Sequence, residues 1–136
     1  MADPSSYQIG GDHYRRQPIQ HWDMVEETGL DYFLGCATKY LSRFHLKGTP
    51  RQDLEKAKHF LLRRGTPTAK DLWVYSLHHE IITKWVEGLD FSTEREVEPL
   101  IRAALSAIFL GDFEEAIWNI DQVLAAEPDS SYTNQS

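Results

Sequence analysis

Three positively charged residues recur at every fourth position in one segment of the chain, namely Lys39, Arg43 and Lys47. Residues four apart lie on the same face of an α-helix, so the spacing predicts a row of cations along one helix face. The segment GLDYFLGCATKYLSRFHLKG, residues 29–48, is bracketed by glycines, as expected for such a helix. A row of ammonium and guanidinium groups suits the phosphates of a nucleotide, and arginine can bind a phosphate with two parallel hydrogen bonds.

The next segment adds an acid and a further cation. In DLEKAKHFLLRR, Asp53 and Lys56 stand three residues apart and are predicted to share one surface of a second helix. A turn at Gly48 would fold this helix back on the first, so that both side chains approach the cationic row and Tyr40 beside it. We therefore expect a cleft between the two helices that holds a triphosphate.

The same spacing has a plainer interpretation. Cations four residues apart often form a solvated helix face, and an exposed ion pair between Asp53 and Lys56 would contribute only ~0 to 1 kcal/mol. However, no Asp or Glu occurs between Asp31 and Asp53, so the row lacks the acidic partners that a stabilising ladder would have. The absence of acidic partners favours ligand binding by the row. A solvated helix face remains the alternative interpretation.

Helix start and stop residues divide the chain into about six helices. The expected helices lie near 18–28, from Asp31 to about Leu46, from Thr49 to Gly65, from Thr68 to about Gly88, from Thr93 to Gly111, and from Asp112 onward. Thr49 with Gln52 and Thr68 with Asp71 have the spacing of capping boxes. No segment alternates with a period of two, so strands are not expected. The sequence predicts an all-α, compact bundle that ends in an antiparallel helical hairpin.

The chain of 136 residues is long enough for one globular domain. We divide it into a flexible arm (1–12), a basic nucleotide-binding region (13–65), an acidic helical region that packs and oligomerises (66–127) and a flexible tail (128–136). Residues 15–70 hold 11 of the 14 Lys and Arg residues against 6 acids, a net +5, although the whole chain carries −7. The acidic remainder would repel long nucleic acid but not a small anion.

Composition also limits location and partners. No stretch approaches the ~20 apolar residues needed to cross a bilayer, and the polar first residues lack an apolar signal core, so we expect a cytoplasmic protein without membrane contact. The single cysteine, Cys36, agrees with a reducing compartment. The predicted helix 68–88 is apolar on more than one side, which predicts a homo-oligomer. A host protein that contacts the acidic hairpin is a further candidate partner.

The pieces HY at 13–14, PI at 18–19 and GLDYFLG…KYLSR…K……DLEKAKHFL through residue 61 resemble the SaV-like domain of phages, over about residues 13–63. That family includes a phage kinase that phosphorylates deoxynucleoside monophosphates without a Walker phosphate loop. The matching positions are His13, Tyr14, Gly35, Lys39, Tyr40, Arg43, Lys47, Asp53, Leu54, Lys56 and Ala57. The family usually has Asn where this chain has Cys36, which puts the substrate and the activity in question.

The resemblance implies phosphoryl transfer from a nucleoside triphosphate in the cytoplasm of a phage-infected host. Such transfer requires mainly alignment and neutralisation of charge, which Lys39 and Arg43 could supply. Asp53 would hold a metal ion or orient the accepting oxygen, and His13 would reach the site from the arm. Mg²⁺ is compatible with this chemistry but is not specified by the sequence. The alternatives are a protein that binds or sequesters a nucleotide without turnover and a host-interaction protein that acts through its acidic hairpin.

Overall fold

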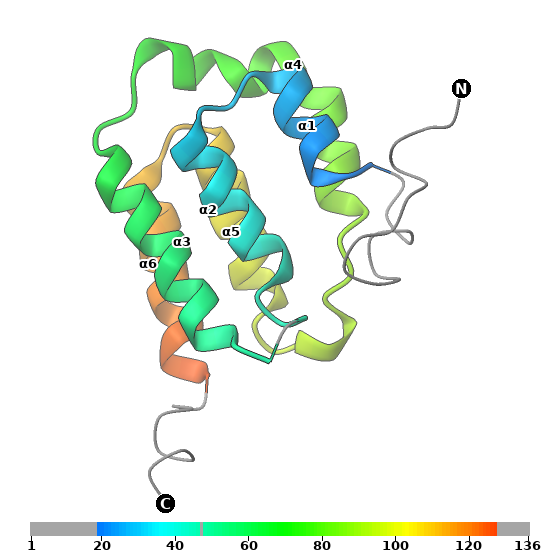
Figure 1. The fold of residues 1–136 in the computed structure, drawn as a ribbon, viewed down its shortest axis with the longest axis vertical. Coiled ribbons are helices and arrows are strands. Elements are labelled where there is room, and N and C mark those ends of the chain that lie inside the picture. The colour runs from blue at the N-terminus through cyan, green and yellow to red at the C-terminus, as the bar shows by residue number, and fades with distance from the viewer. Residues whose placement is uncertain (1–18, 47, 128–136) are drawn as a thin grey trace, which may run out of the picture.

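All of the described secondary structure is helical. The computed structural model describes residues 19–46 and 48–127, and Figure 1 shows this part of the chain as a bundle of helices. The α-helices are α1 (His21–Thr28), α2 (Tyr32–Arg43), α3 (Pro50–Arg64), α4 (Ala69–Glu87), α5 (Glu98–Phe109) and α6 (Phe113–Ala126), with a short 3₁₀ helix at Ser92–Glu94. No strand occurs among the described residues, so the predicted all-α fold is confirmed.

Several sequence predictions lie outside the described residues. They concern the arm 1–12, the tail 128–136, and the candidate side chains His13, Tyr14 and Lys47. The candidate site residues that the structure does describe are Lys39, Tyr40, Arg43, Asp53 and Lys56.

Three of the predicted helix starts have the expected side-chain caps. The carboxylate of Asp31 accepts a hydrogen bond from the Leu34 N–H at 2.9 Å, at the start of α2. Thr68 and Asp71 form the predicted capping box at the start of α4. At the start of α6, the Asp112 carboxylate accepts a hydrogen bond from the Glu115 N–H at 3.1 Å. These caps fix where α2, α4 and α6 begin, and the first of them sets the register of the cationic face.

At one further helix the predicted start is right but the expected cap is absent, and at another the predicted start is wrong. The side chain of Thr49 makes no capping hydrogen bond, so the expected capping box at the start of α3 is absent. Thr93 does not begin α5, which starts at Glu98 after the short 3₁₀ helix. The reason is Pro99, which lacks an N–H and clashes with the preceding turn, so it is tolerated only in the first turn of a helix.

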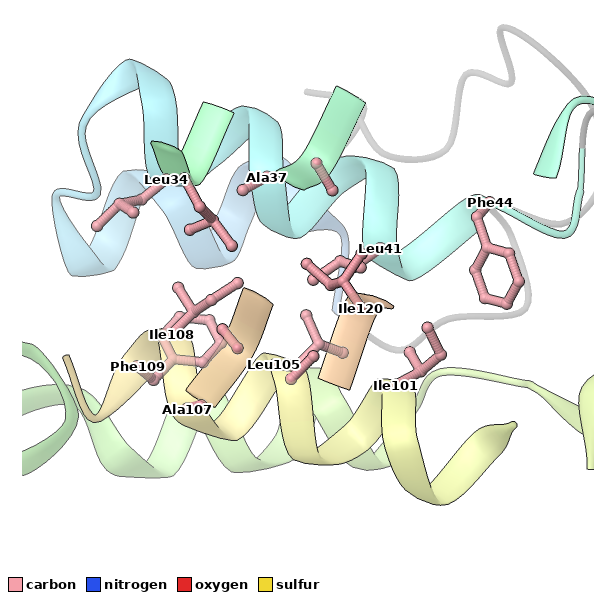
Figure 2. Close-up of a cluster of buried hydrophobic side chains, with 14 of the residues drawn as sticks. Leu34, Ala37, Leu41, Phe44, Ile101, Leu105, Ala107, Ile108, Phe109 and Ile120 are labelled. Atoms are coloured by element: carbon pink, nitrogen blue, oxygen red, sulfur yellow. The ribbon is translucent and has the colours of Figure 1, made fainter. Parts of the chain in front are cut away.

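The core that positions the site lies between α2, α5 and α6. Leu34, Ala37 and Leu41 of α2 are at most 2% exposed. Figure 2 shows them on the side of α2 that faces Leu105 and Ile108 of α5. Burying a leucine side chain stabilises the fold by ~2 kcal/mol. Because this apolar stripe faces inward, the cations of α2 lie on the opposite side of the helix.

Cations of α3 attach this helix to the acidic part of the chain. Lys58 Nζ lies 2.7 Å from a carboxylate oxygen of Asp121 in α6, and Arg51 Nη1 donates to the Leu124 carbonyl at 3.0 Å. Arg64, at the end of α3, contacts the carboxylates of both Asp31 and Asp71 at 2.6 Å. These three cations therefore hold helices together.

Helix α4 is bent and connects distant parts of the bundle. His78 has non-helical backbone angles (φ −128°, ψ 24°), and neither proline nor glycine occurs near it. Figure 1 shows the first half of α4 running across one end of the bundle and the second half lying beside α1. Ile82 and Trp85 in the second half are buried, whereas Leu72 and Leu77 in the first half are more than half exposed. Within the described residues, no helix is long and apolar enough to span a membrane.

Candidate functional site

Lys39 and Arg43 stand one turn apart on the outer face of α2. Both side chains are half-buried, so the alternative of a fully solvated row does not describe them. Both also act on the same neighbour, the imidazole of His21 in α1. Burial, and after it the positive charges of Lys39 and Arg43, lower the pKa of His21 from 6.5 to about 4. Because charge interactions weaken with distance, these two cations and the ring form one local group.

His21 is held in place by contacts on α2 and α4. Its Nε2 lies 2.8 Å from Thr38 Oγ1, and the Thr38 hydroxyl donates to the Leu34 carbonyl at 2.9 Å. The hydroxyl oxygen is then an acceptor, so the neutral imidazole donates from Nε2. The ring also packs on Trp85, with 5.4 Å between the ring centres. The imidazole of His21 is therefore held in one position, with a pKa that keeps it neutral near pH 7.

The depressed pKa of His21 predicts a loss of stability in mild acid. A histidine whose pKa is lowered by folding stabilises the protein above its unfolded pKa of 6.5, and this contribution disappears as the pH falls through about 4. The shift corresponds to about 3 kcal/mol. Urea unfolding of wild type and His21→Gln between pH 7 and pH 4 checks this. The variant should lose less stability over that range, whereas His59→Gln, which changes an exposed histidine, should follow wild type.

Tyr40 belongs to an aromatic group on the α2–α3 pair. Its ring is stacked on Phe60, with centres 6.0 Å apart and planes inclined by 10°. The Lys56 ammonium lies 5.4 Å from the centre of the Tyr40 ring, and the exposed Tyr32 packs edge-on against Phe60 at 5.9 Å. Lys56 and Tyr40 are thus brought together as predicted. An aromatic surface next to a cation is a platform on which a nucleobase can stack.

Asp53 occupies a different position from the one predicted. It is only 3% exposed and lies in the first turn of α3, where its N–H donates to the Thr49 carbonyl at 3.0 Å. The positive end of the helix dipole favours a carboxylate there. The alternative of a surface ion pair with Lys56 is therefore wrong, since Asp53 is not at the surface. A role for Asp53 in catalysis stays a prediction.

Cys36 contacts the aromatic group. A hydrogen bond between the Tyr32 and Cys36 side chains is the main cause that raises the pKa of the Tyr32 phenol. Cys36 is half-buried and lies one turn before Tyr40 on α2. Cys36 is therefore beside the candidate base platform, where its thiol offers weaker hydrogen bonds to a ligand than an amide side chain would.

Two hollows on the described surface lie away from the candidate site. One hollow of about 350 Å³ is bounded by the end of α3 and the α5–α6 turn, and another of about 410 Å³ lies beside residues 92–97. Neither includes a predicted site residue. Within residues 19–46 and 48–127, no three His, Cys, Asp or Glu side chains are grouped so as to hold a metal ion. Mg²⁺ that arrives with nucleotide phosphates would require fewer protein ligands.

Sequence reasoning missed His21, Thr38 and Phe60. Seventeen residues separate His21 from Thr38, and no motif spacing connects either of them to the cationic row. Phe60 is one of several apolar residues in α3, and only its stacking on Tyr40 distinguishes it. Packing of α1 and α3 on α2 is what brings these residues to the site.

Comparison with known proteins gives one family match. A family model described as a protein of unknown function, DUF3310, matches residues 9–62. Of the described helices, the match includes α1, α2 and all but the end of α3. No curated protein and no solved structure matches the chain. The matched segment is similar to that family and contains all of the predicted site residues.

Proposed function

We propose that this protein is a nucleotide kinase that transfers a phosphoryl group from a nucleoside triphosphate to a deoxynucleoside monophosphate. The observation that best supports this is the pair Lys39 and Arg43, which are half-buried, one turn apart, and both close enough to His21 to lower its pKa. They belong to the basic part of the chain, residues 15–70, which carries a net +5 although the whole chain carries −7. Such a region attracts a small polyanion.

The proposed reaction assigns a part to each described residue. Lys39 and Arg43 bind the phosphates, and Arg43 can bind two phosphate oxygens at once. The base stacks on the aromatic group around Tyr40 and Phe60, with Lys56 at its edge. Asp53 orients the accepting oxygen or a metal ion from the first turn of α3. His13, Tyr14 and Lys47 complete the site in this proposal.

The chemistry requires no covalent intermediate on the protein. An oxygen of the monophosphate forms a bond to the terminal phosphorus of the donor, while the bond from that phosphorus to its bridging oxygen breaks. The products are two nucleoside diphosphates. Negative charge on the transferred group and the leaving oxygen is neutralised by the cations and by Mg²⁺ carried on the nucleotide. Catalysis is therefore a matter of positioning and electrostatics.

An assay that measures binding and turnover together tests the proposal. Purified protein is mixed with ATP, Mg²⁺ and each deoxynucleoside monophosphate in turn, and thermal shift and diphosphate formation are followed. Diphosphate product supports the kinase. A thermal shift without product would instead indicate a protein that sequesters nucleotides. The absence of both a thermal shift and product would contradict a nucleotide site. The acidic α5–α6 hairpin would then remain as the functional surface, with a host protein as its partner.

His21 provides a direct reporter of where the nucleotide binds. A phosphate beside Lys39 and Arg43 would offset the positive charges that lower the pKa of His21, so the pKa should rise from about 4 when nucleotide is bound. The imidazole proton signals can be followed by NMR during pH titration with and without a non-hydrolysable triphosphate. An unchanged His21 midpoint at saturating ligand would place binding elsewhere.

The proposed activity also implies the cellular compartment in which the protein acts. A chain that acts on deoxynucleotide pools during phage infection would work in the cytoplasm of the host.

A further inference from the structure

Tyr32 is an exposed aromatic side chain that is nevertheless held in one position. Its side chain belongs to the first turn of α2 and is 71% exposed. The ring packs edge-on against Phe33, with ring centres 5.7 Å apart, and against Phe60 of α3 at 5.9 Å. A hydrogen bond joins it to the Cys36 side chain one turn later on α2. An exposed ring that is already immobilised loses little conformational freedom when a flat ligand stacks on it.

Tyr32 lies on the same stripe of α2 as the two cations of the candidate site. Lys39 follows it by seven residues and Arg43 by eleven, which are close to two and three full turns of α-helix. At a rise of 1.5 Å per residue, Tyr32 precedes Lys39 by about 10 Å and Arg43 by about 16 Å along the helix axis. The outer face of α2 therefore has an aromatic ring near its start and positive charges near its end.

The stacked pair of Tyr40 and Phe60 stands in a different place relative to these cations. Tyr40 directly follows Lys39 in sequence, and one residue corresponds to about 100° around a helix. The Tyr40 ring therefore points toward α3, where it stacks on Phe60. Helices α2 and α3 lie side by side (Figure 1). Phosphates bound by Lys39 and Arg43 can thus be approached from two directions, along α2 from Tyr32 and across from α3.

We propose that Tyr32 is the platform for the base of the triphosphate donor, and that Tyr40 holds the base of the monophosphate acceptor. This assignment rests on the proposed kinase function, in which two bases are held while their phosphates meet. A monophosphate carries its only phosphate one sugar away from the base, which suits Tyr40 directly beside Lys39. A triphosphate extends further from its base, which suits the longer interval from Tyr32 to Arg43.

Equilibrium binding tests the assignment without requiring turnover. Isothermal titration calorimetry measures the affinities of wild type and Tyr32→Ala for a non-hydrolysable ATP analogue with Mg²⁺ and, separately, for a deoxynucleoside monophosphate. Tyr32→Ala should bind the analogue about 5- to 100-fold more weakly, the range for loss of one base–aromatic stack. It should bind the monophosphate like wild type. Tyr32→Phe keeps the ring and should bind the analogue nearly as tightly as wild type.

Trp118→Ala is the matched control for loss of an exposed ring. Trp118 is 55% exposed on α6, away from the cationic face of α2, so both affinities should be unchanged in this variant. Circular dichroism verifies that each variant keeps its helices. In wild type, the analogue and the monophosphate should bind at the same time, because each has a platform of its own.

The outcomes separate this assignment from the kinase activity itself. The assignment is wrong if Tyr32→Ala binds the analogue like wild type, if it loses the monophosphate instead, or if the two ligands compete for wild type. Diphosphate formation by wild type alongside any of these results would leave the kinase standing and remove only the role of Tyr32. A wild type that binds neither ligand would contradict the proposed function and the assignment together.

Discussion

Replacement of Arg43 by alanine is expected to lower the rate of diphosphate formation at least ~100-fold, the usual cost of losing one preorganised donor to transition-state charge. Arg43 lies half-buried on the outer face of α2, where its positive charge acts on His21. Arg43→Lys should recover only part of the rate, since an ammonium keeps the charge but cannot bind two oxygens in parallel. Steady-state kinetics with ATP and a deoxynucleoside monophosphate measure both variants.

The control for this experiment is an exposed arginine of the same basic region. Arg63 on α3 is exposed and outside the candidate site, so Arg63→Ala should leave the rate per chain unchanged. The unfolding free energy of Arg43→Ala should be measured in parallel, to separate loss of chemistry from loss of fold. Wild-type rates for Arg43→Ala would remove this residue from the proposed reaction.

Replacement of Arg64 by alanine is expected to destabilise the fold by about 3 to 4 kcal/mol. Its guanidinium contacts Asp31 and Asp71 at 2.6 Å, and the side chains of Arg64 and Asp71 are only 15% and 7% exposed. It also lies 5.8 Å from the ring centre of Phe113. Removing one partner of a largely buried pair leaves the other charge without compensation, which costs more than the pair itself contributes. Urea unfolding followed by circular dichroism measures the effect.

A matched comparison is available on α4. Lys84 and Glu80 form an ion pair whose side chains are 62% and 81% exposed, so Lys84→Ala should cost less than about 0.5 kcal/mol. A similar small cost for Arg64→Ala would show that α2, α3, α4 and α6 do not depend on this arginine. The contrast between the two variants tests burial, not charge, as the source of the stability.

Local sequence rules were sufficient for most helices. Asp31 and Thr68 mark the starts of α2 and α4 because a cap satisfies backbone groups within three residues of itself. The same rules failed at Thr93, where Pro99 sets the beginning of α5. At Thr49 they gave the right start for α3 but not the side-chain cap, which is absent. At both threonines the residue types fit a capping box. The backbone there does not have the conformation in which the threonine side chain caps a helix.

The candidate site was predicted only in part, for a similar reason. Spacing placed Lys39 and Arg43 on one face of α2, because helical periodicity depends on the chain alone. Spacing could not place Asp53, which lies buried in the first turn of α3. It also gave no indication that His21 packs beside the cationic row, since that contact depends on how α1 meets α2 and α4.

The sequence by itself determined the all-α class, the approximate helix limits and the cationic face of α2, all of which follow from interactions between residues a few positions apart. Only the tertiary structure decided what each charge does. Lys58 and Arg64 hold helices to one another through carboxylates distant in sequence, Asp121 and Asp31, whereas Lys39 and Arg43 lower the pKa of His21. A lysine or arginine has the same charge in every sequence, and its role depends on which groups the packed helices bring within a few ångströms.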